Sequence, residues 1–275
     1  MNLLFIGDVM GEPGLRAVRA HVARLRKQYG LGLVVANAEN VAGGNGVTPE
    51  TAEALFAAGV DVLTNGNHAW DKKEALEYIQ TEPRLLRPHN YPDGTPGDGW
   101  YIARAASGHK VGILNLLGTT FMQPVLSCPF ACADRALAQK PADVKLVFVD
   151  MHAETTSEKM AMGWYLDGRV SAVIGTHTHV PTADERILPQ GTGFLTDVGM
   201  SGCYDSVIGL QTEKSLQRFV HKLPARFEVA EGEGTLCAVL LDLDEQAGRC
   251  RTIERLRLNE SDVQTETPVR RLNLG

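Results

Sequence analysis

The amino-acid sequence predicts an α/β fold in which two β-sheets pack face to face and helices cover both outer faces, a four-layer α-β-β-α sandwich. Two observations predict it: short apolar runs alternate with helical patterns, and candidate β-hairpins appear in the second half of the chain. The chain has 275 residues, of which 44% are hydrophobic and 22% charged, as is ordinary for a globular protein. Because no linker separates two independent units, we expect a single domain over residues 1–275.

Five short runs predict buried strands. They are apolar on both faces, which is typical of strands inside a layered fold. The runs are Leu3–Ile6, Leu31–Ala36, Val60–Thr64, Leu146–Val149 and Ala172–Ile174.

Helices are expected between these runs. Apolar residues recur three or four positions apart at Leu15, Val18, Val22 and Leu25, which places them on one side of a helix. Thr48–Ala58 and Lys72–Ile79 also have helical patterns. A further helix is expected to end near Tyr165 and to begin with a capping box formed by Thr155 and Glu158.

Two hairpins are expected in the second half. Trp100–Arg104 and Lys110–Leu116 flank a Ser-Gly turn, and Leu236–Leu243 and Arg249–Leu258 flank a second turn.

Three segments fall outside these elements. Pro83–Gly99 is rich in proline and glycine and is expected to be a long ordered loop near the site. Residues 121–143 are read as a lid or an extra helical segment. The polar tail over residues 259–275 is read as an arm or a loose end.

Charge and composition exclude some classes of function. The net charge of −6 argues against a broad basic face for duplex nucleic acid or an anionic membrane. No apolar run approaches the roughly 18 residues of a membrane span, and the N-terminus lacks the pattern of a signal peptide. The five cysteines are scattered, so we expect reduced thiols in a cytoplasmic protein.

Polar side chains end each of the five buried runs. The run ends hold Asp8, then Glu39 and Asn40, then Asn67 and His68, then His152, and finally His177 and His179. Because ligand sites in open α/β sheets form at the carboxyl ends of strands, these five ends can converge on one site.

These residue types are typical of metal ligands. Asp8, Glu39, Asn40 and Asn67 offer hard oxygen donors, and the three imidazoles of His152, His177 and His179 offer nitrogen, a mixture that suits Mn, Fe or Zn better than Mg or Ca. Seven candidates are too many for one ion and about right for two that share a carboxylate. Two ions roughly 3.5–4 Å apart are a standard device for attack on phosphorus.

Three motifs resemble the signature of the calcineurin-like metallophosphoesterases, which implies the fold of that superfamily. They are Gly7-Asp8, Gly66-Asn67-His68 and Gly175-Thr176-His177-Thr178-His179. The finer details resemble one branch, the YmdB-like 2′,3′-cyclic nucleotide phosphodiesterases, from the first strand to about Leu258. The segments concerned are Phe5–Val9, Asn37–Asn40, Asn65–Asp71, His152–Lys159 and Thr196–Met200.

The resemblance also implies roles for single residues. It gives the first ion Asp8, Glu39, Asn40 and His179, and the second ion Glu39, Asn67, His152 and His177, with iron or manganese as the metal. It gives His68 the role of general acid. Met10 stands where the wider superfamily has a histidine ligand, and Asn40 is positioned in sequence to supply the absent donor.

Each candidate also has an ordinary structural reading. An Asp or Asn near a turn is usually a cap or turn residue, and a single His is more often a hydrogen-bonded core residue. We read His21, His109 and His221 as surface residues, and His89 and Asn90 as residues that shape their loop. Glu154 and Glu158 are read either as groups that orient ligands or as helix caps. Asp197 and Cys203 lie in a loop-rich region and are given no role.

The resulting hypothesis is a phosphodiesterase with two divalent or trivalent metal ions. A small phosphodiester, foremost a 2′,3′-cyclic nucleotide, would be hydrolysed by in-line attack of a metal-bridging hydroxide, with His68 protonating the leaving oxygen. One alternative is a phosphomonoesterase or nucleotidase on the same scaffold. The other is a metal-bound regulatory protein with little turnover. The sequence leaves a homo-oligomer open.

Overall fold

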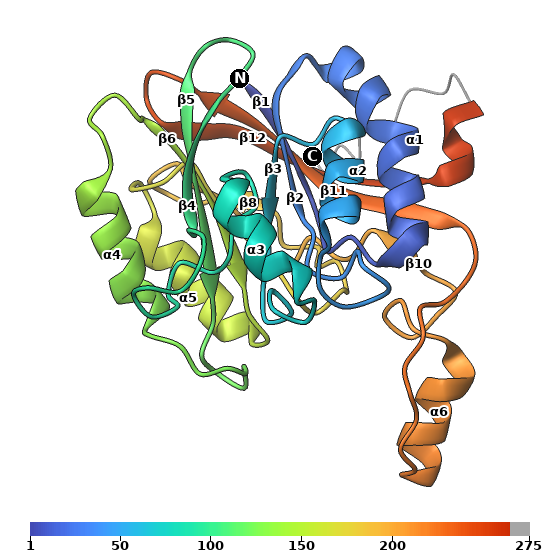
Figure 1. Ribbon diagram of the computed structural model, residues 1–275. Coiled ribbons are helices and arrows are strands. Elements are labelled where there is room, and N and C mark those ends of the chain that lie inside the picture. The colour runs from blue at the N-terminus through green and yellow to red at the C-terminus, as the bar shows by residue number, and fades with distance from the viewer. Residues whose placement is uncertain (265–275) are drawn as a thin grey trace.

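The computed structural model describes residues 1–264 and confirms the four-layer sandwich (Figure 1). The first of two six-stranded sheets has the order β10-β11-β1-β2-β3, and β12 also pairs with β11. Its strands are β1 (Asn2–Ile6), β2 (Leu31–Asn37), β3 (Val62–Thr64), β10 (Gly202–Cys203), β11 (Gly234–Asp244) and β12 (Arg249–Asn259). Since β1, β2 and β3 run parallel, their carboxyl ends lie at one edge of this sheet.

The second sheet has the order β4-β5-β6-β7-β9-β8. Its strands are β4 (Trp100–Arg104), β5 (Lys110–Leu117), β6 (Leu146–His152), β7 (Ala172–Thr176), β8 (Arg186–Ile187) and β9 (Gly193–Leu195). Strands β5, β6, β7 and β9 are parallel, so His152 at the end of β6 lies level with Thr176 at the end of β7. Both expected hairpins, β4 with β5 and β11 with β12, are confirmed.

The two sheets bury their facing sides against each other. Phe5 on β1 and Phe148 on β6 are fully buried, and their ring centroids lie 4.8 Å apart. Aliphatic side chains from both sheets surround this pair, among them Leu33 and Ile174. The apolar character of the strands on both faces follows, because each sheet also packs helices on its other side.

Helices cover the two outer faces. Helices α1 (Gly11–Tyr29), α2 (Pro49–Ala57) and α3 (Glu74–Thr81) pack on the first sheet, and α4 (Pro129–Gln139) and α5 (Thr156–Leu166) pack on the second. In α1, Leu15, Val18, Val22 and Leu25 are all buried against the sheet, as their spacing predicts. Helix α2 begins with a capping box in which the side chains of Thr48 and Thr51 satisfy each other's backbone amides.

The segments of uncertain role are partly helical. Within residues 121–143, α4 belongs to the outer layer of the second sheet, where Cys132, Ala133 and Ala136 are buried. At the C-terminal end, the 3-10 helix Glu260–Gln264 lies beside α1, and Arg16 forms an ion pair with Glu260. The rest of the expected tail, residues 265–275, lies outside the described residues.

One helix stands away from the sandwich. Helix α6 (Thr212–His221) lies at the end of an arm that projects from the body beyond β10 (Figure 1). Only Ser215 of this helix is buried, and Leu216, Phe219 and Val220 are exposed. The expectation that His221 is a surface residue is confirmed, since it is exposed at the end of this helix.

Two expectations were wrong. His21 is fully buried rather than on the surface, because α1 meets the end of β12 there and His21 Nε2 lies 2.8 Å from the carbonyl oxygen of Asn259. The capping box of Thr155 and Glu158 does not form. The Glu158 carboxylate instead accepts hydrogen bonds from Thr119 and Thr120, and the hydroxyl of Thr155 has no partner.

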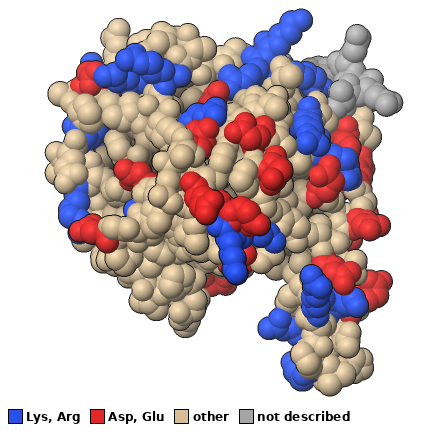
Figure 2. Space-filling model, in the orientation of Figure 1, with Lys and Arg blue, Asp and Glu red and all other residues tan. Residues whose placement is uncertain are grey.

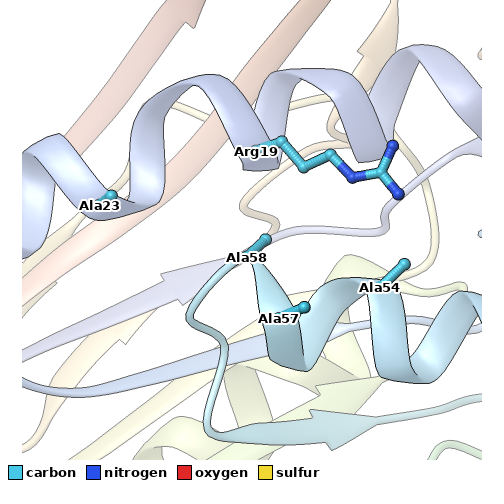
Figure 3. Close-up of a pocket in the computed structure, with 5 residues that line it drawn as sticks. All are labelled: Arg19, Ala23, Ala54, Ala57 and Ala58. Carbon is cyan, nitrogen blue, oxygen red and sulfur yellow. The ribbon is translucent and has the colours of Figure 1, made fainter.

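A depression of about 340 Å³ lies between α1 and α2, lined by Arg19 and four alanines, and it contains none of the run-end residues (Figure 3). On the face shown in Figure 2, acidic side chains lie between the basic ones, so no continuous basic field forms there. Within residues 1–264, no helix combines the length and the apolar character that a membrane crossing needs.

Candidate metal centre

The two sheets contribute different donor atoms to one site. Asp8, Glu39, Asn40 and Asn67 directly follow β1, β2 and β3 of the first sheet. His152 ends β6 and His177 and His179 follow β7 of the second sheet. All four oxygen donors therefore come from one sheet and all three imidazoles from the other, so the site lies where the edges of the two sheets meet.

Four of the seven side chains converge at one point. The Nε2 atom of His152 lies 3.0 Å from Glu39 Oε1, 3.0 Å from Asn67 Oδ1 and 3.1 Å from His177 Nδ1. These are the four residues that the family resemblance assigns to the second ion. Ligand atoms of Glu39, His152 and His177 all lie within 4.8 Å of one another, close enough to share a cation.

The remaining candidates lie beside this group. Asn40 Oδ1 is 3.3 Å from His179 Nε2. Asp8 is fully buried, and its Oδ2 accepts a hydrogen bond of 3.2 Å from the backbone amide of His177. The other oxygen, Asp8 Oδ1, is buried and has no hydrogen-bond partner. The structure thus brings together all seven residues that the sequence singles out.

Two of the imidazoles are held by an oxygen on their outer side. His179 Nδ1 lies 2.9 Å from the carbonyl oxygen of Ile208, and His177 Nε2 lies 3.0 Å from the carboxylate of Glu154. Since these oxygens only accept, the facing nitrogens must carry the protons. The lone pairs then lie on His179 Nε2 and His177 Nδ1, which face Asn40 and His152 within the site and could bind a metal ion there.

The third imidazole, that of His152, is held by a buried chain of hydrogen bonds. Its Nδ1 lies 2.9 Å from the hydroxyl of Thr176, and that hydroxyl donates to Asp150 Oδ1 at 2.7 Å. Asp150 also accepts from Thr64 at 2.5 Å and from Asn37 at 3.1 Å. Because the Thr176 proton is used toward Asp150, its oxygen accepts from His152 Nδ1, and His152 Nε2 is the atom that faces the other ligands.

The charges in the site are strongly coupled. Burial opposes ionisation of His152, but the carboxylates of Glu39 and Asp8 outweigh it and raise the pKa of His152 to about 9. Burial would raise the pKa of Glu39, yet His152 lowers it to about 2. Burial and the neighbouring His152 lower the pKa of His177 to about 3, and burial raises the pKa of Asp8. The protonation state of each of these four side chains therefore depends on the protonation states of the others.

His68 lies at the rim of this group. Its side chain is partly exposed, and its Nδ1 lies 2.8 Å from Asp71 Oδ2. Its backbone amide donates a hydrogen bond of 3.0 Å to Glu39 Oε2. Since Asp71 accepts the proton on Nδ1, the Nε2 atom of His68 is the one left for exchange with a ligand.

Comparisons with known proteins agree with this geometry. The family model for YmdB-like proteins matches residues 4–256. The chain belongs to the YmdB-like family. It is 47% identical to the 2′,3′-cyclic-nucleotide 2′-phosphodiesterase of Bacillus subtilis (strain 168), over 96% of this chain and 99% of that protein.

Two crystal structures resemble this YmdB-like chain over most of their length. One is a hypothetical protein from Thermus thermophilus, with a TM-score of 0.88, 45% identity, and coverage of 94% of this chain and 99% of that one. The other is a phosphatase from Mycoplasma pneumoniae, with a TM-score of 0.89, 35% identity, and coverage of 94% and 93%.

Several residues whose role the sequence leaves open have defined contacts in this family member. Glu154 contacts His177 and thus orients a candidate ligand, whereas Glu158 binds the loop after β5. Asn90 is buried and bonds the backbone of Leu117 and Ser127, which fits the loop-shaping reading. Cys203 lies in β10, and its thiol contacts the backbone of the arm rather than the candidate ligands.

No role was expected for three carboxylates that contact candidate residues or their neighbours. Asp71 lies three positions after His68, a spacing that a search for histidine partners could have found. Asp150 and Asp197 gave weaker signals. Asp150 lies inside an apolar run, and Asp197 follows a strand of only three residues.

Proposed function

We propose that this member of the YmdB-like family is a metal-dependent phosphoesterase that hydrolyses a small phosphodiester, with 2′,3′-cyclic nucleotides as its substrates. The observation that supports the proposal is that oxygen donors from one sheet meet imidazoles from the other sheet. Two of these imidazoles are held by an oxygen on the side that faces away from the site. The substrate is taken from the Bacillus subtilis relative, whose name specifies the 2′ ester of a 2′,3′-cyclic nucleotide. The expected product is therefore a nucleoside 3′-phosphate.

The residues present fit a pair of metal ions. Asp8 Oδ1 is a buried carboxylate oxygen without a hydrogen-bond partner, and the imidazole of His152 lies 3.8 Å from it, so a metal ion bound there would offset the cost of its burial more fully. A set of carboxylate, carboxamide and imidazole donors suits iron, manganese or zinc, with iron or manganese favoured by the family resemblance. We assign Asp8, Glu39, Asn40 and His179 to one ion and Glu39, Asn67, His152 and His177 to the other. When bound, the ions would acidify water and neutralise phosphoryl charge.

The chain's own residues supply the rest of the reaction. Attack on phosphorus breaks the bond to a ribose oxygen, and an alkoxide is a poor leaving group unless it is protonated. His68 is the proposed acid, because Asp71 holds its Nδ1 proton and leaves Nε2 to donate to the leaving oxygen. The hydrogen bond from the His68 backbone to Glu39 fixes this acid relative to the carboxylate that both ions are proposed to share.

The direct test is a substrate panel with added manganese or iron. The proposal expects turnover of 2′,3′-cyclic nucleotides to nucleoside 3′-phosphates at a higher kcat/KM than turnover of phosphomonoesters. Preference for monoesters would favour the phosphomonoesterase alternative. Metal uptake without turnover of any phosphate ester would favour the regulatory alternative.

The role of His68 has its own test. His68→Ala should keep the metal content of the parent but lose about 10²–10⁴-fold in kcat on a cyclic nucleotide. The loss should be much smaller on a substrate with an activated leaving group such as p-nitrophenolate, which needs no proton. An equal loss on both substrates would contradict the role of general acid.

A further inference from the structure

The turn after β7 has an unusual backbone. His177 and His179 have φ angles of 98° and 65°, in the left-handed region that residues other than glycine rarely adopt. Both imidazoles belong to the proposed ligand set. Because this conformation is intrinsically unfavourable, surrounding contacts must hold it in place.

The carboxylate of Asp197 supplies several of these contacts. Its Oδ2 accepts hydrogen bonds from the backbone amide of Thr178 at 3.1 Å and from the hydroxyl of Thr178 at 2.7 Å. The same oxygen accepts from Lys159 Nζ at 2.7 Å, and Oδ1 accepts from the amide of Gly199 at 2.8 Å. Thr178 lies between the two histidines in the chain, so Asp197 binds the middle residue of the turn through two hydrogen bonds.

Lys159 and Asp197 form a fully buried ion pair. Lys159 begins on α5, on the outer face of the second sheet, and its stem passes Gly175 on β7. A Cβ atom at Gly175 would lie 2.7 Å from Lys159 Cδ and 1.8 Å from the carbonyl oxygen of Thr196. A buried ion pair contributes little net stability to a fold, which favours a role for this pair other than stabilisation.

The segment that carries Asp197 also reaches the first sheet. The amide of Met200 donates to the carbonyl of His179 at 3.2 Å, and the amide of Ser201 donates to the carbonyl of Asp8 at 2.9 Å. One short stretch of chain therefore connects ligands from both sheets. Its position is fixed at the other end by the Asp197–Lys159 pair.

We propose that Asp197 and Lys159 act as a positioning pair, which holds the His177–Thr178–His179 turn in its left-handed conformation and so presets both imidazoles for metal ions. The proposal rests on the metal centre of the proposed function. Among the described residues, neither side chain forms a hydrogen bond to the side chain of a proposed metal ligand. The pair acts through the geometry of the turn.

The test compares manganese binding in variants of the full chain by calorimetry. Thr178→Val removes the hydroxyl bond to Asp197 without leaving a buried charge unpaired, and should weaken manganese binding about 10-fold, since partners of metal-bound histidines typically contribute 10–100-fold. Thr178→Ser restores the hydroxyl and should recover most of this loss. The double variant Asp197→Asn with Lys159→Met removes both charges and should lose closer to 100-fold.

Asp167→Asn is the matched control. Asp167 follows α5, the helix that carries Lys159, and accepts hydrogen bonds from the backbone amides of Gln190 and Thr192, away from the histidine turn. Manganese affinity should be unchanged there. Activity gives a second readout: at saturating manganese the kcat of Thr178→Val should approach that of the parent, whereas general misfolding would lower it at every manganese concentration.

Parent-like manganese affinity in both folded test variants would overturn the positioning role, as would an equal loss in Asp167→Asn. Failure of the proposed function has a different signature, because the parent itself would then take up no manganese. A parent that binds manganese but turns over no cyclic nucleotide would overturn the substrate assignment and leave the positioning pair in place.

Discussion

Replacing Gly66 by alanine places a methyl group inside the candidate metal centre. Gly66 immediately precedes Asn67, and a Cβ atom there would lie 2.2 Å from Cδ2 and Nε2 of His152 and 2.5 Å from Glu39 Oε2. His152 and Glu39 are fully buried, so neither can move freely into solvent. The perturbation is small in volume but acts on two proposed ligands of the second ion.

The expected magnitude follows from these distances. Non-bonded heavy atoms normally rest about 3.5–4.0 Å apart, so the imidazole and the carboxylate must separate from the new methyl by about 1 Å or more. A misplacement of about 1 Å typically lowers turnover about 10²-fold. Overpacking of a tightly packed site also destabilises a fold by about 1–3 kcal/mol. Gly66→Ala should therefore lose most of its turnover and bind manganese weakly, while remaining folded.

The assay measures kcat/KM on a 2′,3′-cyclic nucleotide, manganese affinity and the free energy of unfolding in urea. Gly32→Ala is the control, because it lies on β2 away from the site and its Cβ would meet chiefly the flexible side chain of Met1. The control should keep parent-like turnover and manganese affinity. If Gly66→Ala also bound manganese and turned over substrate at parent levels, the proposed placement of Glu39 and His152 around the ions would be refuted.

Three further predictions follow from the same structure. Glu39→Gln should weaken both metal sites together, measured as metal content per chain; full metal content with full activity would rule out a shared carboxylate. Manganese affinity should rise about tenfold per pH unit up to about pH 9, because a metal ion must displace the proton that His152 retains below its raised pKa; equal affinity at pH 6.5 and 8.5 would contradict this. Phe5→Ala should lower the free energy of unfolding by about 3–5 kcal/mol, because its ring packs on Phe148 between the sheets; a urea-melt difference below about 1 kcal/mol would refute that packing argument.

The parts of the fold that sequence patterns predict are those with local causes. A strand buried on both faces must be apolar throughout, so β1, β2 and β6 are visible as runs, and the polar residue after each run marks its carboxyl end. Parallel strands place those ends at one edge. This is why the proposed ligands, which are far apart in sequence, could be grouped from the sequence alone.

The remainder depends on partners distant in sequence. His21 lies three positions after Val18 on the buried side of α1, and the carbonyl oxygen that faces its Nε2 belongs to Asn259, 238 residues further along the chain. Glu158 has the right spacing to cap α5, but its carboxylate accepts hydrogen bonds from Thr119 and Thr120 in the loop after β5 instead. Strands of two or three residues, such as β8, β9 and β10, carry too few side chains for a periodic pattern. The partnership of Lys159 with Asp197 is invisible in the sequence because 38 residues separate them.

The division of donors between the two sheets has a consequence for the molecule as a whole. Ions bound between the sheets would add a further link across the sandwich, beside its apolar packing and the hydrogen bonds that Asn37 and Thr64 of the first sheet donate to Asp150 of the second. A ligand that binds the folded state alone stabilises it in proportion to the logarithm of its concentration over its dissociation constant. Removing the ions with a chelator should therefore lower the free energy of unfolding of the whole domain. The supply of metal would then affect the lifetime of the folded protein as well as its turnover.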